Sequence, residues 1–214
     1  MSIVLVLDPA ASTGYCLVSI STDGSRALIY SYGFIDVDCS SEYSGDWCID
    51  LQNQLRKICE KHCVSRLAVE NFFFSKRYAN GSTVNVELRT AIYIMARQMN
   101  LPYTILGISE WKKFISGRVT PTREQKKKWG AARAKKLAIQ QALWERYQIR
   151  FPNHSISKKT GRPMALRLDI VDVVAQAIYF CKIILGVTKI GNRVDVPKDI
   201  AVRGKIGFEY PKDG

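Results

Sequence analysis

Four acidic residues stand at positions where an unpaired charge is costly. Asp8 ends the apolar run "SIVLVLD", and Glu70 ends another, "RLAVE". Asp169 and Asp172 open the apolar segment "LDIVDVVAQAIYFCKIIL", and their spacing of three places both on one face of a helix. Three of them have an ordinary explanation: Asp169 as a helix cap, Asp172 as a first-turn carboxylate and Asp8 as a turn residue before Pro9. As a set they favour a functional role, because charges are not left unpaired at the edge of a core.

Carboxylates of this kind suit hard divalent cations. If the two apolar runs are adjacent parallel strands, Asp8 and Glu70 lie side by side at one edge of the sheet, and a helix can add Asp169 and Asp172. Such an all-oxygen set favours Mg²⁺ or Mn²⁺. Two ions about 4 Å apart would activate a water and stabilise the leaving oxygen of a phosphodiester. We therefore expect two metal ions per site, with these four residues as metal ligands and catalytic residues, and no small-molecule cofactor.

The basic charge is concentrated in one part of the chain. The 214 residues carry a net charge of +13. Residues 110–167 hold 16 basic and 3 acidic side chains, whereas residues 1–109 hold 9 and 10, and residues 168–214 hold 7 and 6. A solvated face explains a short run of charges, but an asymmetry this large favours a polyanionic partner. Aromatic residues interleaved with the basic ones in this span suit phosphates and bases.

Hydrophobic periodicity predicts an α/β fold that combines hairpins with crossover units. Strands are expected at 2–8, 15–21, 27–37, 66–70 and 103–108, and helices at 46–63, 84–100, 109–117, 131–147 and 168–185. The segment 118–130 is polar, and 152–163 has the composition of a loop. We expect a single domain over 1–214, with a basic insertion at about 118–165 and a tail at about 187–214 that we cannot assign.

Three phenylalanines, Phe72 to Phe74, follow Glu70 after a single asparagine in the stretch "LAVENFFFSK". This is more aromatic surface than an ordinary turn requires. Either the three side chains belong to the core, or at least one is exposed and stacks on a base, which is worth about 1–3 kcal/mol.

The ordered motifs resemble the ribonuclease H-like nucleases, and among them the RuvC-type Holliday junction resolvases. The matching pieces run in family order through "VLDPAASTGYCLV", "LAVENFFFSK", "LGISEWKKFISG", "GAARAKKLAI" and "LDIVDVVAQAI". The resemblance implies a ribonuclease H-like fold with a five-stranded mixed sheet flanked by helices, and Asp8, Glu70, Asp169 and Asp172 match the family's four acidic residues. The span from Glu70 to Asp169 is longer than in the compact bacterial enzymes, and the expanded form looks more like a phage, viral or organellar relative.

The resemblance also implies how DNA is bound. Phe73 takes the place of the aromatic wedge that enters the junction, with Phe72 and Phe74 beside it. Lys112 and Lys135 correspond to family lysines near the site, and the second match depends on an alignment gap. The full set of predicted DNA-binding residues is Phe72, Phe73, Phe74, Lys76, Arg77, Lys112, Lys113, Lys126, Lys127, Lys128, Arg133, Lys135 and Lys136.

By this resemblance the chain is a crossover junction endodeoxyribonuclease of DNA recombination and repair. It would act as a homodimer that nicks opposed strands of a four-way junction, leaving 5′-phosphate and 3′-hydroxyl ends. Residues 86–99 would form the dimer interface through Ile92, Met95, Ala96 and Met99, or that face packs on the sheet instead. Another nuclease on this fold, cutting flaps or RNA–DNA hybrids, and a non-catalytic junction binder are the alternatives.

The remaining features indicate a cytoplasmic protein, at a nucleoid or a viral replication site. The first residues reach an aspartate at position 8 and lack a basic segment, so they do not form a signal peptide. The sequence has no apolar run long enough for a membrane helix and is expected to have no membrane partner. The six cysteines include no CxxC pair and are predicted to be free thiols.

Overall fold

The computed structural model describes residues 1–71, 79–117, 121–152, 154–156, 163–165 and 167–194. Its strands are β1 (Ser2–Asp8), β2 (Ser12–Ile20), β3 (Arg26–Asp36), β4 (Val64–Glu70), β5 (Tyr103–Leu106), β6 (His154–Ile156), β7 (Pro163–Ala165) and β8 (Lys189–Asn192). Its helices are α1 (Ser44–Lys61), α2 (Ala79–Gln98), α3 (Ile108–Ser116), α4 (Arg123–Trp129), α5 (Ala131–Tyr147), α6 (Asp169–Tyr179) and the π-helix η2 (Phe180–Ile184).

A mixed six-stranded sheet forms the centre of the fold, in the order β5-β4-β1-β2-β3-β8. β1, β2 and β3 form antiparallel hairpins, whereas β4 lies parallel to β1 and β5 lies parallel to β4. The β1–β4 register pairs Leu7 with Val69, so the next residues, Asp8 and Glu70, lie at the same edge of the sheet. The predicted α/β class and the parallel placement of these two strands are confirmed.

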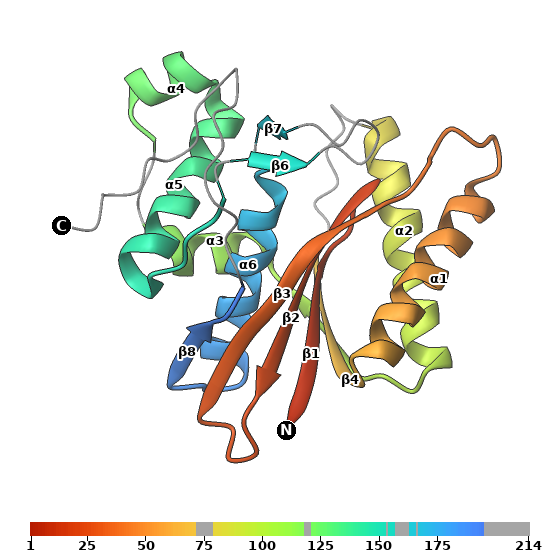
Figure 1. The fold of residues 1–214 in the computed structure, drawn as a ribbon. Helices are drawn as coiled ribbons and strands as arrows, with labels where there is room; N and C mark the ends of the chain where they lie inside the picture. Colours follow the sequence, from red (N-terminus) through yellow and green to blue (C-terminus); the bar gives the residue numbers. More distant parts are fainter. Residues whose placement is uncertain (72–78, 118–120, 153, 157–162, 166, 195–214) are drawn as a thin grey trace.

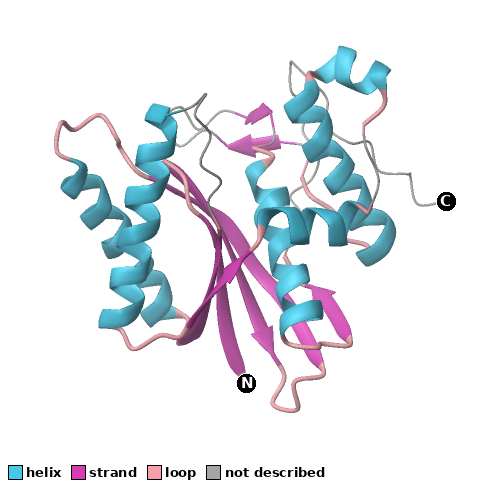
Figure 2. Ribbon diagram, turned by 180° about the vertical axis from the view of Figure 1, so that it is seen from behind, coloured by secondary structure: helices cyan, strands magenta, loops and turns pink. Residues whose placement is uncertain are grey.

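Helices cover both faces of the sheet, as Figures 1 and 2 show. α1 and α2 lie on one face, where Leu5, Leu7 and Leu67 point into a core shared with both helices. α3, α5 and α6 lie on the other face, over a second core that contains Val4, Val6 and most of α6. Because β1 is buried on both faces, its sequence reads as a continuous apolar run.

The structure differs from the sequence prediction in four elements. The sheet has six strands and not five, because residues 189–192 of the predicted tail pair with β3 as β8. Residues 123–129 form helix α4 within the polar segment 118–130, for which the sequence predicted no helix. The predicted loop 152–163 contributes to the β6–β7 hairpin. α2 begins at residue 79, five residues before the predicted start.

α4 begins at a capping box, and a glycine separates it from α5. The Thr122 side chain accepts a hydrogen bond from the Gln125 backbone N–H, and the Gln125 side chain accepts one from the Thr122 N–H. This capping box satisfies two of the amide groups that a helix start leaves without partners. Gly130, with φ of 79°, then ends α4 and begins α5, a backbone conformation that favours glycine.

All six cysteines are free, but only Cys16, Cys59 and Cys181 are buried, whereas Cys39 and Cys48 are half-buried and Cys63 is exposed. In the part of the chain that the structure describes, no helix combines the length and the apolar character that a membrane span requires.

Candidate active site

Asp8 and Glu70 meet where two parallel strands end. Burial, the charge of Glu70 and a hydrogen bond with the Glu70 carboxyl group raise the pKa of Asp8 well above its usual value. The nearby Asp169 charge adds to this rise, whereas Lys136 lowers it. Two carboxylates this close cannot both ionise freely without a cation between or beside them. The end of the sheet is therefore a site of concentrated negative charge.

The first turn of α6 brings Asp169 and Asp172 to the same end. α6 crosses β2 at Gly14, the residue that pairs with Asp8. A Cβ atom at Gly14 would lie 3.5 Å from the Val173 Cβ and 3.6 Å from the Asp169 carbonyl oxygen, so helix and strand are in van der Waals contact here. The Asp8 charge reaches Asp172 and helps to raise its pKa. The four predicted acidic residues thus converge from three separate segments.

Lys136 on α5 bridges the two α6 carboxylates. Its ammonium group donates a hydrogen bond to Asp169 Oδ1 and lies 3.1 Å from Asp172 Oδ2. Burial alone would lower the pKa of Lys136, but Asp172 and Asp169 outweigh this effect and raise it. Lys136 therefore remains protonated and offsets part of the negative charge of the cluster.

Asp172 is the more buried of the two α6 carboxylates: its side chain is 10% exposed, against 45% for Asp169. Burial raises the pKa of Asp172 to about 6, although Lys136 and Lys112 act in the opposite direction. Its Oδ1 atom is buried and has no hydrogen-bond partner in the described part of the protein. A buried carboxylate oxygen without a partner is costly, and a cation would satisfy it.

The donor set fits a hard divalent cation in its chemistry. The four side chains supply carboxylate oxygens only, and Mg²⁺ or Mn²⁺ prefers such ligands. Within the described ranges, no three His, Cys, Asp or Glu side chains are already arranged to hold a metal ion. Lys136 lies between Asp169 and Asp172 instead. Metal binding at these residues therefore requires the Lys136 ammonium to move away from at least one of them.

Two residues at this site were not predicted as site residues. The buried Trp111 indole N–H donates a hydrogen bond to Glu70 Oε1 at 2.8 Å. The buried Arg89 Nε–H donates to the Glu70 carbonyl oxygen at 3.0 Å. In the sequence, Trp111 stands out only as one of several aromatics in the basic span. Arg89 has no signal there that separates it from an exposed helix arginine.

A cavity of about 570 Å³ lies beside the carboxylates, between α3 and α5. Four lysines line it, together with Asp172: Lys112, Lys113, Lys135 and Lys136. Its remaining walls include Pro121, Ala132 and Ile139. A phosphate group suits such a lining, because lysine ammonium groups form charge-assisted hydrogen bonds with phosphate oxygens. The cavity would hold that phosphate next to the acidic cluster.

The other predicted DNA-binding residues fall into three groups. Lys126, Lys127 and Lys128 are exposed on α4, and Arg133 lies partly buried on α5. Lys135 is exposed, so Lys136, and not Lys135, is the α5 lysine that contacts the carboxylates. The wedge candidates Phe72, Phe73 and Phe74, with Lys76 and Arg77, lie outside the described residues.

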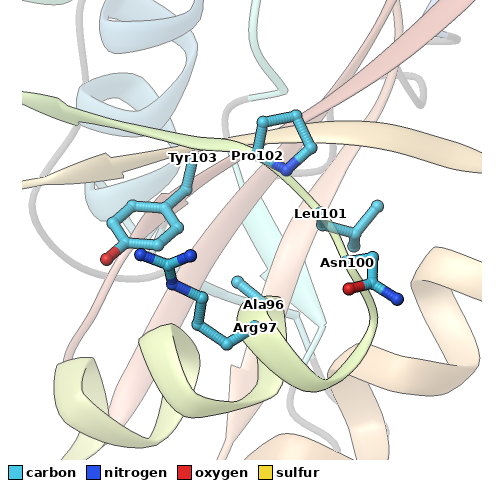
Figure 3. A pocket seen from close by; sticks show the side chains of 6 residues that line it. All are labelled: Ala96, Arg97, Asn100, Leu101, Pro102 and Tyr103. Atoms are coloured by element: carbon cyan, nitrogen blue, oxygen red, sulfur yellow. The ribbon is translucent and has the colours of Figure 1, made fainter.

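A second cavity, of about 590 Å³, lies at the opposite end of β4 and β5 from Glu70 (Figure 3). Its lining comes from the end of α2 and the start of β5, and Figure 3 shows the Arg97 guanidinium beside the Tyr103 ring. Tyr103 pairs with Leu67, whereas Leu106 pairs with Glu70. This cavity is therefore separate from the carboxylate cluster.

Comparison with solved structures identifies the fold. The chain is similar to T. thermophilus RuvC in complex with a Holliday junction substrate, with a TM-score of 0.55 and 12% identity over 83% of this chain and 94% of that one. A second T. thermophilus RuvC structure matches with a TM-score of 0.54 and 14% identity over 84% and 95%. The yeast mitochondrial Holliday junction resolvase Ydc2 gives 0.48 and 14% over 85% and 79%.

At these identities the likeness establishes the fold, which is the ribonuclease H-like fold of RuvC. No family model matches the chain, and no curated protein matches its sequence.

Proposed function

We propose that this protein is a structure-selective endonuclease that resolves four-way DNA junctions. It nicks symmetrically opposed strands in a divalent-metal-dependent reaction and leaves 5′-phosphate and 3′-hydroxyl ends. One observation carries the proposal: Asp8, Glu70 and the Asp169–Asp172 pair come from three separate segments and converge at one end of the sheet. The fold is that of RuvC, a nuclease, and the lysine-lined cavity beside the cluster supports a phosphodiester substrate.

In the proposed hydrolysis, the four carboxylates bind the metal ions and the lysines of the cavity bind the phosphate. Asp8 and Glu70 present carboxylate oxygens from the rigid sheet, and Asp169 and Asp172 present theirs from α6. Bound Mg²⁺ or Mn²⁺, two per site, would supply an activated water and offset the charge on the leaving oxygen. Lys112 and Lys136, which line the cavity with Asp172, hold the phosphate against the carboxylates.

The choice of a four-way junction rests on the resemblance and on charge. The T. thermophilus RuvC structure that this chain resembles contains a Holliday junction substrate. The exposed lysines of α3, α4 and α5 supply phosphate contacts beyond the cleavage site. The phenylalanine run after Glu70 remains the predicted wedge, with Phe73 as the residue that enters the junction.

The decisive experiment uses synthetic substrates with each strand labelled in turn. We expect Mg²⁺-dependent paired nicks on opposed strands of a four-way junction, with ends that a DNA ligase seals. A flap and an RNA–DNA hybrid of matched length serve as competitors. Faster cleavage of either would identify another nuclease on this fold. Tight junction binding with no nicking in Mg²⁺ or Mn²⁺ would identify a non-catalytic junction binder.

The α4 lysines are expected to set part of the salt dependence of DNA binding. Consecutive helix residues point about 100° apart, so no more than two of Lys126, Lys127 and Lys128 face one DNA surface. Replacing all three with alanine should reduce the magnitude of the slope of log K against log salt by about 1–2, at about 0.9 per lost phosphate contact. Lys57→Ala/Lys61→Ala, on α1 across the sheet, is the matched control. Equal slopes for the α4 variant and the parent would remove α4 from the DNA surface.

Of the two alternatives for the apolar face of α2, the structure has the face packed on the sheet. Ile92, Met95 and Ala96 are buried in the core with α1 and the sheet, and Met99 packs against the same core. The face predicted for the dimer therefore packs on the sheet. Dimerisation through those four residues is excluded by this packing.

We propose a homodimer that uses the outer face of α2 instead. Val86 and Ile94, eight residues apart on one helix face, are 43% and 49% exposed, and Ile105 on the edge strand β5 is 50% exposed. The stacked rings of Tyr93 and Tyr103, with centroids 4.8 Å apart, place α2 beside β5. These exposed apolar side chains therefore lie on a helix and on the edge strand beside it.

Ile94→Glu should convert the dimer to a monomer, because it places a charge among these exposed apolar side chains. Light scattering should then give a mass near 24.2 kDa, half that of the parent. Ile49→Glu is the control, since Ile49 is equally apolar and 58% exposed on α1. A monomeric parent, or a dimeric Ile94→Glu variant, would contradict this interface.

A further inference from the structure

Trp111 places a hydrogen-bond donor on a carboxylate of the proposed metal site. Its side chain is fully buried, with 0% exposure, in the core between α3 and the sheet. A buried indole N–H needs an acceptor, and here the acceptor is Glu70 Oε1 at 2.8 Å. The ring is large and enclosed, so it holds its N–H at one position relative to the end of β4.

The backbone of Glu70 is fixed independently of its side chain. The Glu70–Leu106 pair belongs to the β4–β5 ladder, and Arg89 donates to the Glu70 carbonyl oxygen. These contacts hold the main chain and leave the carboxylate to rotate. The Trp111 N–H supplies the restraint on the carboxylate itself, and Asp8 meets the same group from β1.

The donor on Glu70 is also neutral. Lys136 contacts Asp169 and Asp172 with a full positive charge, which must be displaced when a cation binds there. An indole N–H orients Glu70 without neutralising it, and it can remain in place when a metal binds. Carboxylate ligands held in this way by outer contacts bind metals more tightly.

α3 also reaches the other side of the cluster. Lys112, the next residue, has its ammonium group 4.9 Å from the Trp111 ring centroid, and its charge acts on Asp172. The same short helix therefore touches Glu70 through Trp111 and faces Asp172 through Lys112. A movement of α3 would alter both halves of the site together.

We propose that Trp111 is a positioning residue that orients Glu70 for divalent-metal binding. The proposal rests on the metal-dependent function proposed above, and it concerns how the site is built rather than which DNA is cut. It assigns to one indole N–H a part in metal affinity, separate from the contribution of the ring to the core.

Trp111→Phe tests this role, because phenylalanine keeps an aromatic ring and removes the N–H. Mn²⁺ binding measured by calorimetry should weaken by about 10–100-fold, the usual cost of losing an outer contact to a metal ligand. The matched control is Trp47→Phe, which removes an indole hydrogen bond of 2.7 Å from Trp47 on α1 to the carbonyl oxygen of Tyr43, the residue before that helix. Equal Mn²⁺ affinities for the parent and Trp111→Phe would overturn the proposal.

A second measurement does not depend on how well Trp111→Phe folds. The parent protein has four tryptophans, so its ¹H–¹⁵N spectrum has four indole signals. The variants Trp47→Phe, Trp129→Phe and Trp144→Phe assign three of them, and the remaining signal is that of Trp111. The Trp111 signal should shift on titration with Mg²⁺ and remain unshifted in Glu70→Gln, while the Trp47 signal stays constant in both proteins. A Trp111 signal that does not respond to Mg²⁺ in the parent would also overturn the proposal.

The two proposals fail in different ways. If Mn²⁺ binds and Trp111→Phe weakens it, but no junction is nicked, the positioning role stands and the nuclease proposal fails. If junctions are nicked and Mn²⁺ affinity is unchanged in Trp111→Phe, the nuclease proposal stands and the positioning role fails. If neither protein binds Mn²⁺, the positioning role is wrong.

Discussion

Asp8→Asn is expected to reduce junction nicking by more than about 100-fold while junction binding stays within a few-fold of the parent. Loss of an outer contact to a metal ligand costs about 10–100-fold, so loss of a ligand should cost more. Asparagine keeps the size of the side chain and removes the charge that faces Glu70 and Asp169. Single-turnover nicking in Mg²⁺ and a gel-shift titration in EDTA measure the two effects separately.

The thermal stability of Asp8→Asn without metal shows whether a loss of nicking comes from the site or from unfolding. Because the pKa of Asp8 is raised by burial and by Glu70, its ionised form costs the folded state free energy at neutral pH. Asp8→Asn should therefore melt no lower than the parent in EDTA. Asp50→Asn, an exposed aspartate on α1, is the control and should nick at the parental rate. Parental nicking by Asp8→Asn would remove Asp8 from the active site.

Without metal, the protein is expected to lose stability as the pH rises through about 6. Burial raises the pKa of Asp172 from an ordinary value of about 4 to about 6. A carboxyl group with a raised folded-state pKa favours folding fully below its unfolded pKa, and this contribution is lost as the pH rises through the folded value. A shift of about two units corresponds to about 3 kcal/mol. Urea unfolding in EDTA at pH 4, 5, 6 and 7 measures this dependence.

Asp172→Asn separates this effect from other titrations. The variant should show a smaller decrease in unfolding free energy between pH 4 and 7, because the carboxyl group responsible is gone. Asp8 contributes in the same direction through its own raised pKa. Lys136 acts at alkaline pH only, since its raised pKa favours folding until the pH exceeds that value. An identical pH dependence in parent and variant would show that Asp172 is not titrating as described.

The sheet and the acidic cluster were predictable because their signals are local and strong. A continuous apolar run such as "SIVLVLD" indicates a buried strand, and a carboxylate at its end marks the edge of the sheet. A spacing of three fixes Asp169 and Asp172 on one helix face whatever the rest of the chain does. Together these rules placed Asp8 and Glu70 at neighbouring strand ends, where the structure has them.

The elements that the sequence did not predict depend on tertiary context, or carry a local signal within a highly charged segment. The residues "KIGN" of β8 have no alternating pattern and form a strand because the edge of β3 is available to them. The sequence contains the capping box of α4, from Thr122 to Gln125. The high charge of the surrounding segment obscures this helix signal. Arg89 and Trp111 acquire their roles only from tertiary contacts with Glu70.

Lys135 and Lys136 show how much one position on a helix changes the surroundings of a side chain, although both line the cavity. Adjacent helix residues point about 100° apart, so a shift of one position in an alignment gap changes which lysine faces the carboxylates. Ala134, Leu137 and Ala138 are buried on α5, and Lys136 sits at the border of that face. The structure places Lys136 against Asp169 and Asp172 and leaves Lys135 exposed.

Because α6 crosses β2 at Gly14, the acidic cluster can assemble only after most of the chain has been synthesised. Asp8 lies on the first strand made by the ribosome, and its partners on α6 emerge 161 residues later. A growing chain can pair β1 with β2 and β4 long before α6 is available to dock on them. Until α6 docks, the nascent protein holds only the Asp8–Glu70 half of the proposed cation site. The proposed nuclease activity therefore requires that most of the chain has been made and folded.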